Sequence, residues 1–564
     1  MKRMLVSAFI AAALFCSISP AQEQTPDKMY WGDEVPPEWN GTWPSEFLTV
    51  PEKTGYTRTT SVRELHEFIS LLKWNSENVH VFDIFTSPLR NISSAVVLAN
   101  PRVTTPQQAK DSGKPVIYLQ GSIHPPESEG TEALLMVMRE ILMGDRKDLL
   151  DNQILIVAPI FNVDGTETVS TRDGLPHMAG SRSNAGGFDL NRDGVKLETL
   201  EVNALYTNVF NPWDPVLIYD AHRMGSGNAA YANAYANSTV PAAHPAPRGY
   251  VWDTLFPEVR TLVRKNFGVE VFSHALFDKA WPPTTWSHDA AIWSVEAKFV
   301  VSNYGLRNRM SILTETPGRV GFERQIFGHY AYVMSLLEYT NVHGKEMAAI
   351  CRKADEETVA RVKAEAESGR LRNWVEGRYE SRGKIDLLAY RDIPVGLLPG
   401  TSVRGTLPDA FAGPPEIVRG VEDLTKPVGT RDAAVPRGYL IPADMTDIVA
   451  KLRTHNIRVE ALEKPMTAEG EQFVVNRMSK VRRGGYDMTV LEGGFFGPSV
   501  REFPAGTFFL DMAQPMANAA FYYLEPESMD GFVGWGVLDA ALSALGADVR
   551  PVVYPIFKFK KEVR

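Results

Sequence analysis

The chain has 564 residues, more than one hydrophobic core usually organises, so two folded units are expected. With 44% hydrophobic and 23% charged residues, the composition is that of an ordinary globular protein and excludes a disordered or fibrous chain. The formal net charge of −9 argues against nucleic acid or an anionic membrane surface as the partner and favours a small or peptidic ligand.

The first residues have the pattern of an export signal. Lys2 and Arg3 precede the apolar run of residues 4–15, and residues 19–21 are the small residues that a signal peptidase reads. We therefore assign residues 1–21 to a signal peptide and expect an exported protein, periplasmic or extracellular. The run is too short to span a bilayer, and no later segment approaches about 18 uninterrupted apolar residues, so no mature transmembrane helix is expected.

The cysteine count limits covalent cross-links. Cys16, inside the signal segment, raises a lipid-anchored cysteine as an alternative, but bulky Phe15 stands where a small residue is preferred. Removal of the signal leaves only Cys351, so no intrachain disulfide can form in the mature chain. The core must therefore provide the stability.

Apolar, β-branched runs alternate with amphipathic helical segments in the first part of the chain. The runs are VIYLQ (116–120), ILIVAPI (154–160), PVLIYD (215–220) and MSILT (310–314). Because successive rather than alternate positions are apolar, we expect strands covered by helices on both faces, and therefore an α/β architecture. Helices are predicted over residues 131–142 and 324–339, the first preceded by Pro125 and Pro126, which a helix start tolerates.

The character of the sequence changes near residue 345. A charged, helix-favouring segment predicts a connecting helix over residues 346–372, between a first domain of residues 22–345 and a smaller α+β domain of residues 373–564. In the latter, strand-like pieces such as residues 384–390 alternate with Pro/Gly turns, and a helix is predicted over residues 444–457. We recognise no catalytic, metal-binding or ligand-binding motif in this second domain.

Four polar residues lie at the ends of the predicted strands. His124 and Glu127 follow the first strand, His222 lies two residues past the third, and Glu315 directly follows the fourth. Ligands of open α/β sheets bind at the carboxyl ends of the strands. Two imidazoles and one carboxylate form a zinc site that keeps a fourth position for water, which is the catalytic pattern. We expect these three residues to hold one Zn²⁺ per chain and Glu315 to act as general base toward that water.

Each of these residues alone also has an ordinary structural explanation. His124 and Glu127 at this spacing occur as a solvated pair at a helix start, His222 as a satisfied loop histidine, and Glu315 as the ion-pair partner of a nearby arginine. The agreement of several strand ends at one edge favours the zinc site. No Gly-x-Ser-x-Gly elbow, Gly-rich phosphate loop with a following lysine, or His-Glu-x-x-His helix competes with it.

Five motifs follow one another between residues 115 and 340. They are GSIHPPESEGTEA (121–133), PIFNVDG (159–165), SRSNAGGFDLNRD (181–193), YDAHRMGSG (219–227) and SILTET (311–316). In this order they resemble the motifs of the zinc carboxypeptidases of the carboxypeptidase A/B superfamily, and more closely those of its exported bacterial members. The resemblance implies a mixed, largely parallel sheet flanked by helices, and the same zinc ligands and general base that the strand ends indicate.

The resemblance also implies roles for other residues. Asn191 and Arg192 match the pair that holds the free α-carboxylate of the last residue of a peptide, and a planar guanidinium suits the two carboxylate oxygens. Asp189 matches the aspartate that hydrogen-bonds the first histidine ligand and fixes its tautomer. Arg182 matches the arginine that stabilises the oxyanion in bacterial members, with Arg172 as the alternative in the same glycine-rich loop.

Some positions depart from the family pattern. Asp193 and Gly194 replace the Asn-aromatic pair that often follows the arginine, and an ion pair with Asp193 is the structural alternative for Arg192. The family's tyrosine that closes over the substrate lies roughly twenty residues before the catalytic glutamate, where this chain has Trp293. We assign this substrate-binding role to Tyr304, because similar segments occur in the bacterial members.

These features predict a zinc metallocarboxypeptidase that hydrolyses the C-terminal bond of peptides with a free carboxylate. A zinc amidohydrolase acting on small acyl-amino acids or cell-wall peptide fragments is the alternative enzyme, because the same metal site serves both. The alternative of another class is a catalytically inactive peptide-binding module, which has no need of the base Glu315. The sequence leaves open the preferred side chain, the role of the C-terminal domain and the oligomeric state.

Overall fold

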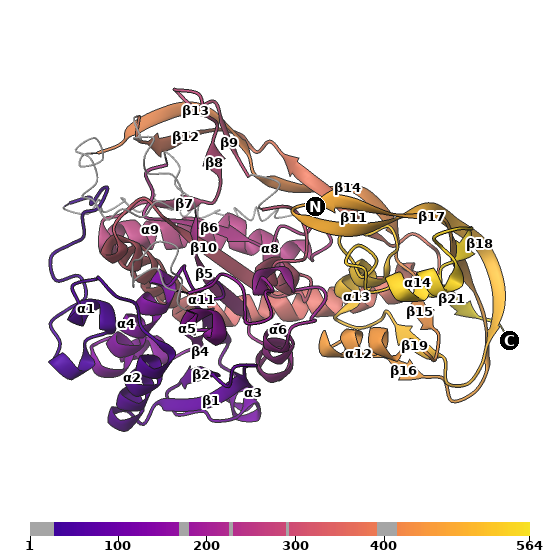
Figure 1. Cartoon of the computed structure of the whole chain (residues 1–564), viewed down its shortest axis with the longest axis horizontal. Helices are drawn as coiled ribbons and strands as arrows, with labels where there is room; N and C mark the ends of the chain where they lie inside the picture. Colours follow the sequence, from indigo (N-terminus) through magenta and orange to yellow (C-terminus); the bar gives the residue numbers. More distant parts are fainter. Residues whose placement is uncertain (1–27, 169–179, 225–228, 289–292, 392–413, 564) are drawn as a thin grey trace, which may run out of the picture.

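The computed structural model describes residues 28–168, 180–224, 229–288, 293–391 and 414–563. The predicted signal segment and Arg172 therefore lie outside the described residues. The chain forms two lobes, and the long helix α11 (Phe322–Glu365) runs from one into the other (Figure 1).

A mixed, largely parallel sheet forms the centre of the first lobe. Its eight strands among the described residues are, in spatial order, β1 (Val79–Thr86), β2 (Ile92–Leu98), β4 (Ile154–Ala158), β3 (Val116–Gln120), β5 (Leu217–Met224), β10 (Met310–Pro317), β6 (Asn233–Asn237) and β7 (Val271–Ser273). The four adjacent strands β4, β3, β5 and β10 are parallel, whereas β1, β2 and β6 join antiparallel to their inner neighbours. The predicted fold class is confirmed.

Helices cover the sheet, as the continuous apolar runs require. Every residue of β3 and β4 is buried, because side chains on both of their faces are covered. Helices α4 (Glu129–Met143) and α9 (Phe256–Phe267) both contact α11 and strands of the sheet. The shorter helices of this lobe are α1 (Val50–Lys53), α2 (Val62–Asn75), α3 (Pro106–Ser112), α5 (Val163–Glu167), α6 (Leu200–Leu205), α7 (Asn211–Trp213), α8 (Pro245–Tyr250) and α10 (Val300–Gly305).

Helix α11 differs from the sequence prediction. It joins the predicted helix of residues 324–339 and the predicted connecting helix of residues 346–372 into one element of 44 residues, so the expected domain boundary at 345 falls inside a helix. Gly344 does not break it. A Cβ at that glycine would lie 2.6 Å from Cγ of Pro115, so the missing side chain lets the helix pack closely against the start of β3. None of the helices in the described part of the chain is both long and apolar enough to cross a membrane.

The chain after α11 has two structural parts. In the first, β12 (Gly383–Ala389) and β13 (Glu416–Leu424) form one sheet with β9 (Thr285–Ser287) and β8 (Leu276–Phe277) of the first lobe, and β11 (Arg372–Glu380) pairs with β14 (Lys426–Ala434). Residues beyond 373 therefore extend back over the first lobe (Figure 1). The predicted boundary at 373 does not separate two independent sheets.

The second part is an α+β unit, which we call the C-terminal domain (residues 435–563). Its sheet contains β15 (Gly438–Ile441), β16 (Glu460–Ala461), β17 (Met466–Arg483), β18 (Tyr486–Phe503), β19 (Phe508–Asp511), β20 (Val552–Val553) and β21 (Phe557–Glu562), and its helices are α12 (Thr446–Thr454), α13 (Ala517–Leu524) and α14 (Asp539–Leu545). One hydrophobic cluster contains Val195 and Ala297 of the first lobe together with Phe521 and Phe532 of this domain. The two lobes therefore share a core.

Candidate metal centre

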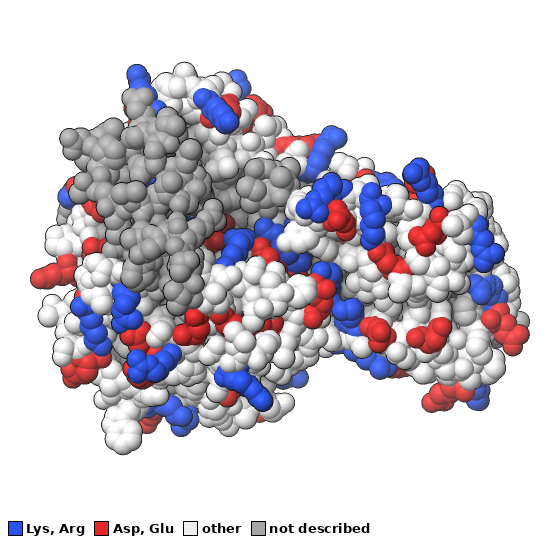
Figure 2. Space-filling view, in the orientation of Figure 1, with Lys and Arg blue, Asp and Glu red and all other residues white. Residues whose placement is uncertain are grey.

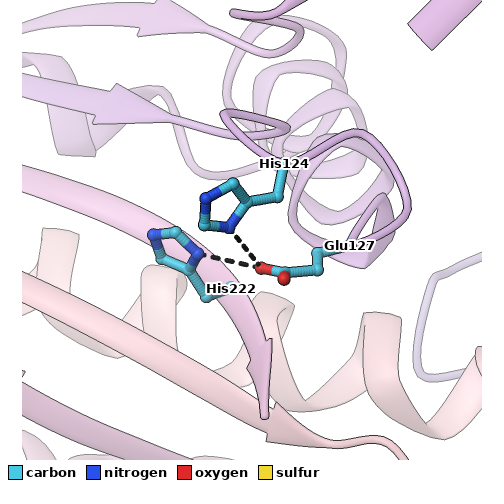
Figure 3. A group of neighbouring side chains, drawn as sticks. All are labelled: His124, Glu127 and His222. Carbon is cyan, nitrogen blue, oxygen red and sulfur yellow. Dashed lines mark hydrogen bonds and ion pairs between the residues drawn. The ribbon is translucent and has the colours of Figure 1, made fainter. Parts of the chain in front are cut away.

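The predicted site residues meet at one edge of the main sheet. The parallel strands β3, β5 and β10 end at the same edge, and their register places Gln120 opposite Asp220 and His222 opposite Glu315. His124 lies on the turn after β3, and Glu127 lies just before α4. Figure 3 shows His124, Glu127 and His222 facing one another across this edge.

Local backbone geometry brings the turn after β3 close to β5. Ser122 has a φ of +49°, in the left-handed region, and its carbonyl accepts a hydrogen bond from the backbone N–H of Asn162 at 3.0 Å. At the start of α4, a Cβ on Gly130 would lie 2.2 Å from Cβ of Ala221. Only glycine allows the helix to approach β5 so closely, and this approach carries Glu127 toward the histidine on β5.

The two histidines share one carboxylate and are oriented by two others. Oε2 of Glu127 lies 3.2 Å from Nδ1 of His124 and 2.9 Å from Nδ1 of His222. The outer nitrogen of His124 lies 2.9 Å from Asp189, and that of His222 lies 3.0 Å from Asp220. Since ionised carboxylates only accept hydrogen bonds, Asp189 and Asp220 favour a proton on each outer Nε2 atom, which is the tautomer that would leave each Nδ1 lone pair free for a metal.

The donor set fits a zinc ion. His124, Glu127 and His222 each offer one ligand atom, and all three atoms lie within 4.8 Å of one another. Tetrahedral zinc with bonds of about 2.0–2.1 Å separates its ligand atoms by about 3.4 Å, close to the distances found here. Two nitrogen lone pairs and one carboxylate oxygen that converge repel one another unless a cation lies between them.

The pKa shifts of His222 and Glu127 also indicate that the centre favours positive charge. Burial disfavours the charged form of His222, but Asp220 and Glu127 outweigh burial and raise the pKa of this imidazole well above its usual range. Burial likewise opposes the ionised form of Glu127, but the two histidines hold its pKa well below the usual range. The electric field at the centre therefore favours a cation.

Glu315 is close to these groups and not bound to them. Its Oε2 atom is buried and has no hydrogen-bond partner among the residues that the structure describes. Burial raises the pKa of Glu315 to about 8, an effect that the charge of His222 opposes and that of Glu127 reinforces. An unpaired buried carboxyl oxygen is costly, and this one lies beside the candidate metal centre.

Arg182 closes the open side of the centre. Its guanidinium donates to Oε1 of Glu127 at 2.9 Å and to Oδ2 of Asp189 at 3.0 Å, while 46% of its side chain stays exposed. It thus contacts a proposed zinc ligand and remains accessible from solvent. The alternative, Arg172, lies outside the described residues.

Asn191 and Arg192 are the pair predicted to hold a substrate carboxylate, and we call them the carboxylate clamp. Asn191 lies next to His222. The side-chain nitrogen of Asn191 lies 3.3 Å from Nε2 of His222, and its oxygen accepts from the backbone N–H of Val300 at 3.0 Å. The guanidinium of Arg192 lies 4.5 Å from the ring centre of Phe299 and 4.0 Å from Asp189. The proposed partner Asp193 instead accepts hydrogen bonds from Thr199 and from the backbone of residue 198.

Tyr304 lies away from the site, contrary to the sequence prediction. It is fully buried on α10, its hydroxyl donates to the carbonyl of Pro215 at 2.6 Å, and its ring packs against Phe210. The side chain faces the core because the helix presents this position to the sheet. The other residue considered, Trp293, is also buried, and its ring lies 4.4 Å from that of Phe299.

Two residues near the centre were missed in the sequence. Asp220 has a detectable signal, because residues two apart on a strand share a face and Asp220 precedes His222 by two. Tyr486, the first residue of β18, has no such signal in the sequence. Burial raises the pKa of Tyr486, the charge of Asp189 reinforces this, and Arg192 and Arg182 oppose it, so the tyrosine lies within electrostatic reach of all three.

The comparisons with known proteins point to zinc carboxypeptidases. Residues 70–240 match the family model described as zinc carboxypeptidase. Carboxypeptidase 2 of Trichophyton rubrum is 23% identical over 474 residues, which cover 79% of this chain and 76% of that protein. Carboxypeptidase 2 of Trichophyton tonsurans is 23% identical over 472 residues, covering 78% and 76%.

Solved structures with lower overall similarity carry related names. A metallo-carboxypeptidase from Burkholderia cenocepacia matches with 15% identity and a TM-score of 0.38, over 50% of this chain and 70% of that one. Carboxypeptidase A from Helicoverpa armigera matches with 15% identity and a TM-score of 0.36, over 50% of this chain and 74% of that one.

Proposed function

We propose that the protein is an exported, zinc-dependent carboxypeptidase that removes the last residue of peptides with a free C-terminal carboxylate. The observation that carries this proposal is the convergence of two Nδ1 atoms and one carboxylate oxygen beside Glu315, whose own oxygen is unpaired. The basic and apolar pattern of the first residues supports export.

His124, Glu127 and His222 would hold the metal. Zinc at such a centre supplies an activated water and polarises the carbonyl of the bond to be cleaved. Asp189 and Asp220 keep both imidazoles in the tautomer that leaves Nδ1 free for a ligand bond.

Glu315 would move the proton. Its Oε2 atom accepts a proton from the attacking water and delivers it to the nitrogen of the leaving residue, so that one group serves as base and then as acid. Arg182 is accessible enough to turn a guanidinium N–H toward the carbonyl oxygen that becomes negative in the transition state.

The clamp would select the end of the chain. The Arg192 guanidinium lies over the ring of Phe299 and offers a planar fork to a carboxylate, and Asn191 offers an amide beside it. A peptide bond in the middle of a chain has no carboxylate to bind there. Selection of a free terminus therefore follows from the chemistry of the clamp.

The test combines metal content with product analysis. We expect one zinc per chain in the wild type and in Glu315→Gln, and release of C-terminal amino acids from a mixed peptide library by the wild type alone. Zinc binding without release by the wild type would contradict the peptide substrate and favour the amidohydrolase. Absence of zinc would contradict the ligand assignment and leave the peptide-binding module.

A further inference from the structure

The carboxylate clamp rests on a segment of the first lobe, residues 296–300. The backbone N–H of Val300 donates to Oδ1 of Asn191 at 3.0 Å, and the ring of Phe299 supports the Arg192 guanidinium at 4.5 Å. The carbonyl of Lys298 accepts from the backbone of residue 194, just after the clamp, at 2.9 Å. The position of both clamp side chains thus depends on where this segment lies.

The C-terminal domain holds that segment from the other side. Oδ2 of Asp530 accepts the backbone N–H of Lys298 at 3.0 Å across 232 positions of sequence, and its other oxygen accepts from the hydroxyl of Tyr522. Asp530 is fully buried. Glu296 forms a buried ion pair with Lys298 and lies 3.8 Å from Nη1 of Arg483, the last residue of β17.

The C-terminal domain also contacts residues 195 and 196, the segment that follows the clamp. The carbonyl of Val195 lies 2.9 Å from Nε2 of His455, and the ammonium of Lys451 donates to the carbonyl of Lys196 at 2.6 Å. The N–H of Gly194 is bound to residue 298, and a Cβ there would lie only 2.8 Å from that carbonyl oxygen. The C-terminal domain therefore contacts the chain on both sides of the 194–298 hydrogen bond that adjoins the clamp.

We propose that Asp530 is a positioning residue for the carboxylate clamp, so that the C-terminal domain completes the substrate site of the first lobe. Asp530 anchors Lys298, the segment then presents Val300 and Phe299, and these orient Asn191 and Arg192. This assignment rests on the proposed function, because it gives the clamp its role. It deepens that function by stating what the second lobe does in it.

A buried ion pair of the same domain provides the control. Glu525 and Lys558 lie 2.6 Å apart and are both buried, and Lys558 also donates to the carbonyl of Ala434 at the end of β14. The described contacts of this pair do not include residues 296–300 or the clamp. Loss of its charge pairing in Glu525→Gln destabilises the domain without acting on the segment.

The experiment measures kcat and KM on an N-acylated dipeptide with a free carboxylate, together with thermal melts. In Asp530→Ala we expect KM to rise by about 10-fold with kcat changed by less than about 3-fold, because uniform binding is lost and the reacting groups stay intact. Asp530→Asn keeps an oxygen for the N–H of Lys298 and should bring KM back to within about 2-fold of the wild type. Glu525→Gln should lower the melting temperature and leave KM unchanged.

A double mutant distinguishes positioning from general loss of stability. In the Arg192→Lys background, Asp530→Ala should raise KM by less than about 2-fold further, because the two residues act through one contact with substrate. Equal effects in both backgrounds, an unchanged KM in Asp530→Ala, or an equal rise in Glu525→Gln would overturn the assignment. If Asp530→Ala does not fold, Arg483→Met provides the test. This variant loses the contact to Glu296 and the hydrogen bond to the carbonyl of Met529, beside Asp530, so it should raise KM by about 3-fold, and an unchanged KM would overturn the assignment. A wild type that binds zinc and cleaves no peptide contradicts the proposed function instead.

Discussion

His222 and Glu315 are direct register partners on the adjacent parallel strands β5 and β10. Neighbouring positions in a parallel sheet point to the same side, so the second histidine of the metal centre and the proposed base extend from one edge in a fixed relation. Their spacing is set by the ladder of backbone hydrogen bonds, which a change of side chain leaves intact. Each of the two can therefore be substituted without displacing the other.

Glu315→Gln should abolish turnover and spare the metal. The amide keeps the shape of the side chain and cannot accept the proton of the attacking water, so kcat should fall by a factor of about 10³ or more. Steady-state kinetics and zinc analysis of the purified variant measure both effects. Glu67→Gln, an exposed position of α2, is the matched control and should change neither. Loss of zinc in Glu315→Gln would show that this carboxylate is a ligand.

Asp220→Asn should weaken metal binding. The aspartate fixes the outer nitrogen of His222 at 3.0 Å, and loss of such a partner typically costs about 10–100-fold in metal affinity. Competition with a chromogenic chelator gives the zinc dissociation constant. Asp432→Asn removes a partly exposed aspartate that pairs with Arg372, and its affinity should match the wild type. Equal affinity of Asp220→Asn and the wild type would remove Asp220 from the centre.

Arg192→Lys should weaken recognition of the carboxylate. A lysine carries the same charge on a point-like ammonium, so it loses the paired hydrogen bonds, and KM should rise by about 10- to 100-fold with a smaller change in kcat. The exposed Arg378→Lys is the control. If KM stays constant, the carboxylate of the substrate binds elsewhere.

The buried carboxyl of Glu132 predicts a pH dependence of stability. Burial raises its pKa to about 8, and its oxygens accept the N–H and hydroxyl of Thr60 at 2.7 and 2.6 Å. Because the folded pKa lies above the unfolded value, the folded state binds the proton more tightly, and stability falls as pH rises from about 4.5 to about 8.

Glu132→Gln removes this titration. Between pH 5 and 8 the wild type should lose on the order of a few kcal/mol of unfolding free energy that the variant retains, as denaturant melts at several pH values can measure. Identical slopes for both proteins would show that Glu132 ionises in the folded protein at its ordinary pKa.

Sequence patterns predicted the centre of the fold because the carboxyl ends of parallel strands always lie at the same edge of a sheet. The apolar runs defined β3 and β4 closely, and parallel strands bring their carboxyl ends together whatever lies between them. The prediction for Tyr304 was wrong because distance along the chain does not give the direction of a side chain, and this one faces the core. Asp530 and Tyr486 follow the first-lobe residues that they interact with by more than 200 positions in sequence, and no local pattern predicts such interactions.

Helix α11 couples the unfolding of the two lobes. The helix crosses the expected domain boundary without interruption, and residues of both lobes bury their apolar side chains in the cluster that includes Val195 and Phe521. A cut at residue 345 would end the helix in its middle and expose the first-lobe members of that cluster, such as Val195 and Ala297, to water. We therefore expect that the first lobe does not fold without the C-terminal domain. Heating should then unfold the whole molecule as one cooperative unit.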